Sequence, residues 1–95
     1  MSKNNYIEIF QNLKEDIRFL VSSDVRSKIL ISLHEGPKDL SSLRNELGFT
    51  SSTILHGMYQ LDEKKLILKK SGIYSLSQIG QVVILKLINI MNALS

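Results

Sequence analysis

The sequence predicts a mainly helical single domain of the α+β class that carries one small β-hairpin. Five stretches repeat their apolar residues every three or four positions, which is the period of a helix with one buried face. Two short apolar runs, 66–70 and 73–77, flank the polar turn Ser71-Gly72, a pattern typical of a hairpin. Residues 1–95 have the length of one domain with a modest core.

Capping residues mark the ends of the first two helices. The first helix ends near Val21, and Ser22-Ser23-Asp24 offers N-cap side chains for the second. Gly36-Pro37 ends the second helix, because glycine takes the left-handed C-cap conformation and proline cannot continue a helix. The apolar faces consist of Tyr6, Phe10, Leu13, Ile17 and Leu20, then Val25, Ile29, Leu30 and Leu33.

The next two helices form a helix-turn-helix, at about residues 39–64. Asp39 caps a short helix that Gly48 ends, and Thr50 or Ser51 caps the helix that follows. Two helices joined by a short turn with a glycine are typical of this unit. The hairpin, at about 66–77, comes directly after it, which predicts a winged helix-turn-helix: four helices, the wing, and a last helix at about 78–94.

The second helix of this unit is predicted to read duplex DNA. It buries Ile54, Met58 and Leu61 and points hydrogen-bonding side chains outward, which suit base edges in a major groove. Its N-terminus and the nearby lysines suit phosphates. The predicted base-reading residues are Ser52, Thr53, His56, Tyr59 and Gln60, and the predicted phosphate contacts are Ser51, Lys64, Lys69 and Lys70.

Composition narrows the classes of function. The net charge of +3 is compatible with a nucleic-acid partner without requiring one. The chain has no cysteine, which excludes disulfides, thiolate metal sites and cysteine nucleophiles. Because it shows neither a glycine-rich phosphate loop nor a serine-histidine-acid set, we expect no enzyme, cofactor or metal site. Its start lacks the apolar core of a signal peptide, and its longest apolar stretch, 82–94, is too short to span a bilayer, which predicts a cytoplasmic protein.

Three short patterns resemble the ArsR-like winged-helix regulators. They are the pair Ser52-Thr53 at the start of the reading helix, the run Leu61 to Ile67 that leads into the wing, and the closure of Tyr74, Leu76, Ser77 and Gly80. The resemblance covers about residues 20–95 and implies a transcription regulator. The resemblance extends to archaeal regulators in which a winged helix precedes a larger C-terminal effector domain. One alternative left open is that the chain is a fragment and that its last helix docks on such a domain.

The last helix is too apolar to be buried on one side alone, which predicts an interaction surface. In ArsR-like regulators the first and last helices form a dimer interface, so the resemblance implies a homodimer and a pseudo-palindromic DNA site. The interface residues so predicted are Tyr6, Phe10, Leu13, Val83, Leu87, Ile90, Met91 and Leu94.

Other functions stay open at the level of sequence. The main alternative is a winged helix that docks on another protein without binding DNA, with Leu55 and Tyr59 as candidate anchors. The lysine pairs would then only keep the hairpin edge solvated. A small-molecule sensor would need a ligand between the terminal helices, where the sequence shows no polar group to hold one. The histidines His34 and His56 are not expected to bind metal.

Overall fold

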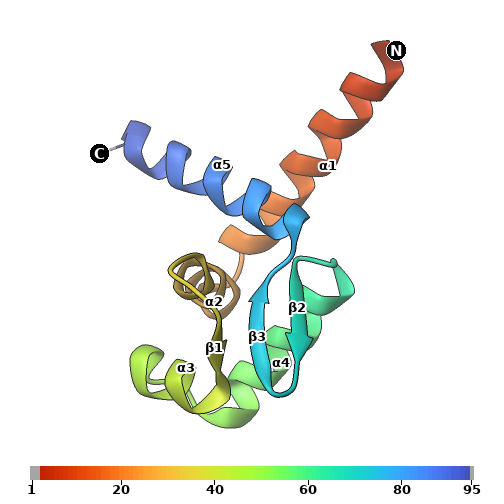
Figure 1. Cartoon of the computed structure of the whole chain (residues 1–95). Helices are drawn as coiled ribbons and strands as arrows, with labels where there is room; N and C mark the ends of the chain where they lie inside the picture. The colour runs from red at the N-terminus through yellow and green to blue at the C-terminus, as the bar shows by residue number, and fades with distance from the viewer. Residues whose placement is uncertain (1–2, 95) are drawn as a thin grey trace.

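Five helices and three short strands make up the part of the chain that the computed structural model describes, which is residues 3–94, with side chains for residues 7, 8 and 11–94. The elements are α1 (Lys3–Val21), α2 (Asp24–His34), β1 (Lys38–Asp39), α3 (Leu40–Leu47), α4 (Ser51–Glu63), β2 (Ile67–Lys70), β3 (Ile73–Leu76) and α5 (Gln78–Leu94). The free ends of α1 and α5 diverge at one end of the molecule, and α3 and the β2–β3 turn lie at the other (Figure 1). The winged helix-turn-helix prediction is confirmed.

The predicted capping residues set the helix boundaries. The side chain of Ser23 accepts a hydrogen bond from the amide of Arg26 at the start of α2. Thr50 does the same for Thr53 at the start of α4. Gly48 ends α3 with φ +78, the left-handed conformation that glycine adopts without strain.

One strand, β1, was not predicted from the sequence. β1 pairs antiparallel with β3, with Lys38 opposite Tyr74 and Asp39 opposite Ile73, so the sheet order is β1-β3-β2. Two residues are too few to show an alternating pattern. Asp39 is extended, as an N-cap residue must be, and this backbone suits pairing with the edge of β3.

One core joins all five helices and the sheet. The residues that are fully buried in it come from every helix: Leu20, Ile29, Leu30, Leu43, Ile54, Leu61, Val83 and Ile84, together with Leu66 from the turn before β2. The apolar stripes predicted for the second to fourth helices supply most of this set. Full burial of each such side chain contributes about 1.5–3 kcal/mol.

The start of α5 crosses the turn between α4 and β2 at very close range. The amide of Ser77 donates to the carbonyl of Leu66 at 3.0 Å, and its hydroxyl donates to the carbonyl of Lys65 at 2.6 Å. The same hydroxyl accepts from the amide of Gly80, which caps α5. A Cβ on Gly80 would stand 2.0 Å from the carbonyl oxygen of Leu66, so a residue without a side chain is required there.

Gly80→Ala is expected to lower the free energy of unfolding by at least about 3 kcal/mol, because the new methyl group would force α5 away from the Leu66 backbone. Gly57→Ala in α4 is the matched control, since its Cβ would meet only the side-chain ends of Ile29 at 3.0 Å and Val25 at 3.1 Å. Urea unfolding of both variants measures the difference. Equal stability of the two variants would show that α5 does not need this close approach.

Candidate nucleic-acid interface

One stripe of α4 is exposed, and it carries the predicted base-reading side chains. Ser52, His56 and Tyr59 lie on it, and 63% of the Tyr59 surface is exposed. Asp62 and Glu63 occupy the last turn of the stripe. Their negative charges oppose a polyanion, so the N-terminal half of α4 is the part that suits DNA.

A groove of about 390 Å³ runs between the first turn of α2 and this half of α4. Its α4 side is formed by Ser52, Thr53, His56, Gly57 and Gln60, and its α2 side by Ser23, Val25 and Arg26. The structure thus brings four of the five predicted base-reading residues to one groove. Gly57 leaves room there because it has no side chain.

The fifth, Tyr59, lies on the wing side of α4. It lines a hollow of about 190 Å³ together with Leu55, Lys69 and Tyr74, among others. The ammonium group of Lys69 stands 5.4 Å from the centre of the Tyr74 ring, within cation–π range. Lys70 is exposed at the end of β2, beside the wing turn. The wing therefore presents Lys69 beside α4 and Lys70 next to its own turn.

Lys64 lies apart from the other predicted DNA contacts. Its ammonium group is 5.4 Å from the centre of the Phe19 ring, and it lines a groove of about 440 Å³ between α1 and α5. Asp16 lies in the same groove, where partial burial raises its pKa and the charge of Lys64 acts in the opposite direction. Lys64 thus faces α1, and it is not grouped with the wing lysines.

Arg26 lies in this groove and was not among the DNA contacts predicted from the sequence. Its guanidinium stacks on the Phe19 ring, 4.1 Å from the ring centre, and donates twice to the Phe19 carbonyl. It also donates to the hydroxyl of Ser22 at 2.8 Å and to the side-chain oxygen of Gln60 at 2.9 Å. An arginine after an N-cap serine is common on helix surfaces, so its spacing in the sequence did not mark this role.

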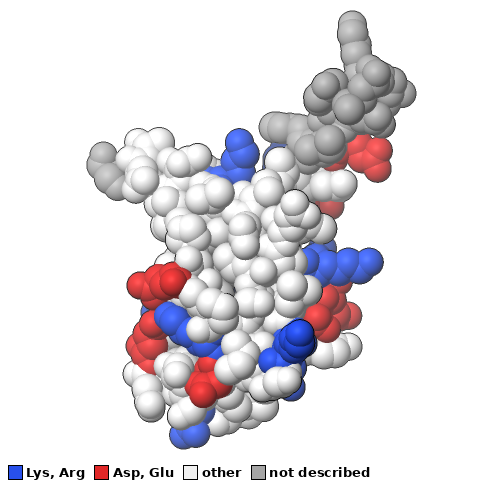
Figure 2. All heavy atoms as spheres, in the orientation of Figure 1, with Lys and Arg blue, Asp and Glu red and all other residues white. Residues whose placement is uncertain are grey.

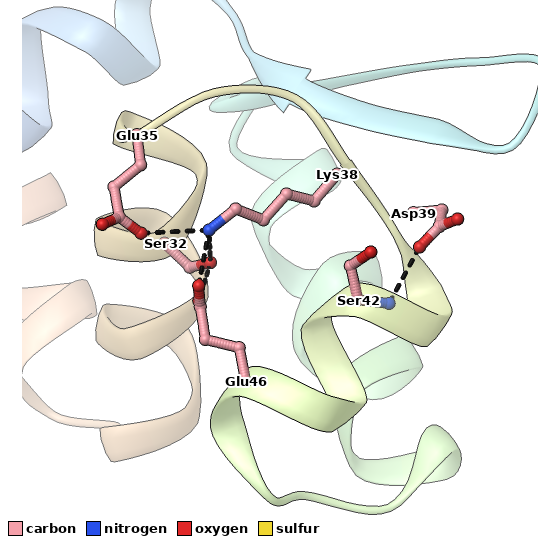
Figure 3. Close-up of polar contacts among 6 residues, drawn as sticks. All are labelled: Ser32, Glu35, Lys38, Asp39, Ser42 and Glu46. Atoms are coloured by element: carbon pink, nitrogen blue, oxygen red, sulfur yellow. Dashed lines mark hydrogen bonds and ion pairs between the residues drawn. The ribbon is translucent and has the colours of Figure 1, made fainter.

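A charged network ties the end of α2 to β1 and α3 (Figure 3). The ammonium group of Lys38 donates to Glu46 at 2.6 Å, to Ser32 at 2.7 Å and to Glu35 at 3.0 Å, and the buried Ser32 hydroxyl donates to Glu46. The Lys38 bond is the main reason that the pKa of Glu46 lies below its ordinary value, and the bond to Glu46 raises the pKa of Lys38. The network holds α3 against α2, and α3 in turn carries the turn into α4.

The terminal helices match the predicted interface only in part. Val83 and Leu87 are buried in the core of the chain itself, so they are not available to a partner, and this part of the prediction is wrong. The periodic pattern could not separate the side of α5 that faces its own core from the side that faces outward. Leu13 is half-buried, whereas Ile90, Met91 and Leu94 are exposed. The side chains of Tyr6 and Phe10 lie outside the described residues.

Charge is unevenly spread over the face drawn in Figure 2. The upper part, over α5, is mostly uncharged, and acidic and basic side chains are mixed over the lower half. The mixture agrees with the small net charge and shows no broad single-sign patch on this face.

A family model described as methanogenesis regulatory protein FilR1, N-terminal domain, matches residues 14–95. The chain belongs to this family. The assignment confirms the regulatory class that the resemblance implied. No curated protein sequence matches the chain.

Solved structures with the same fold are distant in sequence. The transcriptional repressor BigR from Xylella fastidiosa has a TM-score of 0.76 at 18% identity, covering 98% of this chain and 97% of that one. Quinone-bound YodB from B. subtilis has a TM-score of 0.76 at 17% identity, covering 84% and 91%. ZitR from Lactococcus lactis has a TM-score of 0.68 at 19% identity, covering 98% and 75%. These likenesses confirm the winged-helix fold.

Within the described residues, no three histidine, aspartate or glutamate side chains are placed to hold a metal ion. No described helix combines the length and the apolar character that crossing a membrane requires.

Glu46→Gln is expected to lower the melting temperature at neutral pH by a few degrees, because it removes a half-exposed ion pair that contributes about 1 kcal/mol or less. A lowered folded pKa stabilises the protein above the ordinary glutamate pKa of about 4.3, and this stability is lost as the pH falls through the folded value. The wild type should therefore lose more stability than Glu46→Gln between pH 7 and pH 3.5.

Melting curves of both proteins over this pH range measure the difference. Glu63→Gln removes an exposed carboxylate outside the network and serves as the control. Asp39 remains in every variant, and its pKa is lowered by the hydrogen bond from the Ser42 amide, so some acid sensitivity should persist in Glu46→Gln. If Glu46→Gln and the wild type lost equal stability in acid, the network would not hold Glu46 ionised.

Proposed function

We propose that this regulatory domain binds duplex DNA, with the N-terminal half of α4 in the major groove and the wing on the backbone. The single observation that carries the proposal is the exposed polar stripe on the second helix of the helix-turn-helix. Buried residues fix the opposite side of α4, so the stripe has a defined direction. Helices presented in this way are the usual base-reading elements of winged helices and related folds.

The proposed base contacts divide between the two sides of α4. The groove beside α2 is lined by Ser52, Thr53, His56 and Gln60. Tyr59 lines the hollow beside the wing. Short hydroxyl, imidazole and amide groups can donate to or accept from base edges, which is what direct readout requires. Both sides together give one reading surface.

The proposed phosphate contacts come from the two ends of this surface. Ser51 opens α4, where unpaired backbone amides favour an anion. Lys69 and Lys70 lie on the wing strand β2. Lys64 is left out of the proposal because it faces the groove between α1 and α5.

A homodimer through α1 and α5 is part of the proposal. Several large apolar side chains remain exposed on α5, and an uncovered surface of this kind is unusual for a monomer. They are Ile79, Val82, Leu85, Ile90, Met91 and Leu94, with 82% of Leu94 exposed. Burial of these groups against a second copy would place two α4 helices on one pseudo-palindromic site. The effector domain and the cytoplasmic location implied by the sequence stay predictions.

A second candidate function is docking on another protein, and Leu55 favours it. This leucine is 44% exposed beside Tyr59 on the α4 stripe, and an aliphatic and an aromatic side chain together can anchor a protein partner. Against this, the same stripe carries Ser52 and His56, and the hollow beside it is lined by the charged Lys69 and Asp62. The DNA-binding proposal accounts for more of the surface.

DNA binding is tested first by fluorescence anisotropy with a pool of random duplexes at low and then physiological salt. Binding should weaken steeply as salt rises, because lysine contacts release counterions from the phosphates. The double substitution Lys69→Ala with Lys70→Ala should weaken binding to all duplexes by a similar factor and flatten the salt dependence. If folded wild-type protein does not bind at low salt, docking on a protein becomes the leading function.

His56→Ala and Tyr59→Ala provide the contrast to the lysine variant. They should reduce the preference among duplexes while leaving the salt dependence nearly unchanged, since both variants keep every lysine that is proposed to contact phosphates. A lysine variant that binds as tightly as the wild type would show that the wing does not follow the DNA backbone.

The dimer is tested by replacing an exposed apolar residue of α5 with a charged one. Ile90 is 43% exposed, and Ile90→Glu should shift the sedimentation mass from dimer to monomer, because a buried carboxylate without a partner is costly. Leu68→Glu is the control, since Leu68 is exposed on the wing strand β2, which lies away from the free ends of α1 and α5. A monomeric wild type would contradict the dimer.

A further inference from the structure

The side chain of Arg26 is held in place from several directions before any ligand is present. Its Nε and one terminal nitrogen donate to the Phe19 carbonyl at 3.1 and 2.9 Å, and that terminal nitrogen also donates to the hydroxyl of Ser22. The Phe19 ring lies under the guanidinium plane. The other terminal nitrogen donates to Gln60 across the groove. Arg26 is therefore a fixed hydrogen-bond donor directed at α4, the helix proposed to read DNA.

This contact decides which way the amide of Gln60 points. A guanidinium has donors and no acceptor, so only the amide oxygen of Gln60 can face Arg26. The amide nitrogen then points away from Arg26, and no residue in the described part of the chain accepts a hydrogen bond from it. Gln60 lines the groove with Ser52 and His56, so this nitrogen is presented on the proposed reading surface.

We propose that Arg26 is a positioning residue that holds the amide oxygen of Gln60, so that Gln60 presents its amide nitrogen as a donor to an acceptor on the DNA. The proposal rests on the DNA-binding function proposed above. An unrestrained glutamine can turn its amide freely and can pair with adenine through its oxygen and nitrogen together. The Arg26 bond sets the direction of the amide oxygen, so the amide nitrogen is the group that Gln60 presents to the DNA. The acceptors that suit this nitrogen are N7 of adenine or guanine, O6 of guanine, O4 of thymine, or a phosphate oxygen.

Variants of Gln60 test the donor. A preferred duplex is first selected with the wild type, and its affinity is measured together with a set of duplexes that each carry one changed base pair. Gln60→Ala should bind the preferred duplex roughly fivefold to tenfold more weakly, since one hydrogen bond is lost. Gln60→Glu should bind more weakly still. A carboxylate has no N–H to donate, so it would face the acceptor on the DNA with an oxygen that can only accept.

Variants of Arg26 test the positioning. Arg26→Ala frees the amide of Gln60, and the base preference should change at the one position that Gln60 reads. The change in base preference should vanish when Arg26→Ala is combined with Gln60→Ala, because no amide is left to reorient. Arg18→Ala removes an equal charge from α1 and should leave the base preference as in the wild type. Arg26→Lys, which keeps the charge, covers the case in which Arg26→Ala does not fold.

The outcomes separate the two sources of the acceptor. If Gln60→Ala changes the preference at one base position, the acceptor lies on a base edge. If Gln60→Ala weakens binding to every duplex equally, the acceptor is a phosphate oxygen. Both results support the donor role of Gln60. The inference would be overturned, with DNA binding intact, if Gln60→Glu bound as tightly as the wild type. It would also be overturned if Arg26→Ala changed the base preference equally in the presence of Gln60 and in combination with Gln60→Ala. Wild-type protein that is folded yet binds no duplex would overturn both.

Discussion

The near-contact between Gly80 and the Leu66 carbonyl determines how the functional elements sit relative to one another. Leu66 directly follows the turn at the end of α4 and precedes the wing, and Gly80 lies in the first turn of α5. Ser77 bonds to the backbone of both Lys65 and Leu66 and also caps α5. One small region therefore fixes the end of the recognition helix, the root of the wing and the direction of the terminal helix. A displacement there would move all three.

The middle of α4 depends on α2 rather than on the wing. Gly57 allows Ile29 and Val25 to approach the helix backbone, and Arg26 reaches across from the same helix to Gln60. Packing sets the distance between α2 and α4, and the guanidinium sets the orientation of one side chain on the reading surface. The same pair of helices thus supplies both core and site. Rigid support of this kind limits the entropy that ordering the site on DNA would cost.

The fold was predictable because each boundary has a local chemical signal, whereas the site depends on contacts between distant segments. Caps at Ser23, Asp39 and Gly48 and the periodic apolar stripes are readable in one pass along the chain. The bond between Arg26 and Gln60 joins residues 34 positions apart, and no periodic pattern records it. The two-residue strand β1 is too short to alternate. The close approach of Gly80 to Leu66 determines which apolar residues of α5 face the core. The sequence could therefore predict an apolar interaction surface on α5, but not which of its residues are exposed.

The modest charge of the domain links DNA binding to the apolar face of α5. A net charge of +3 and mixed signs on the surface give a single copy few phosphate contacts, and each contact adds only a limited, salt-sensitive contribution. In the proposed homodimer, two copies joined through α1 and α5 would double these contacts, and once one α4 helix is bound the second would meet its half-site at a high effective concentration. The exposed side chains of Ile90 and Leu94 would then serve DNA affinity without touching DNA. In this arrangement, a regulator gains specificity from the spacing of two weakly charged reading surfaces rather than from a strongly basic one.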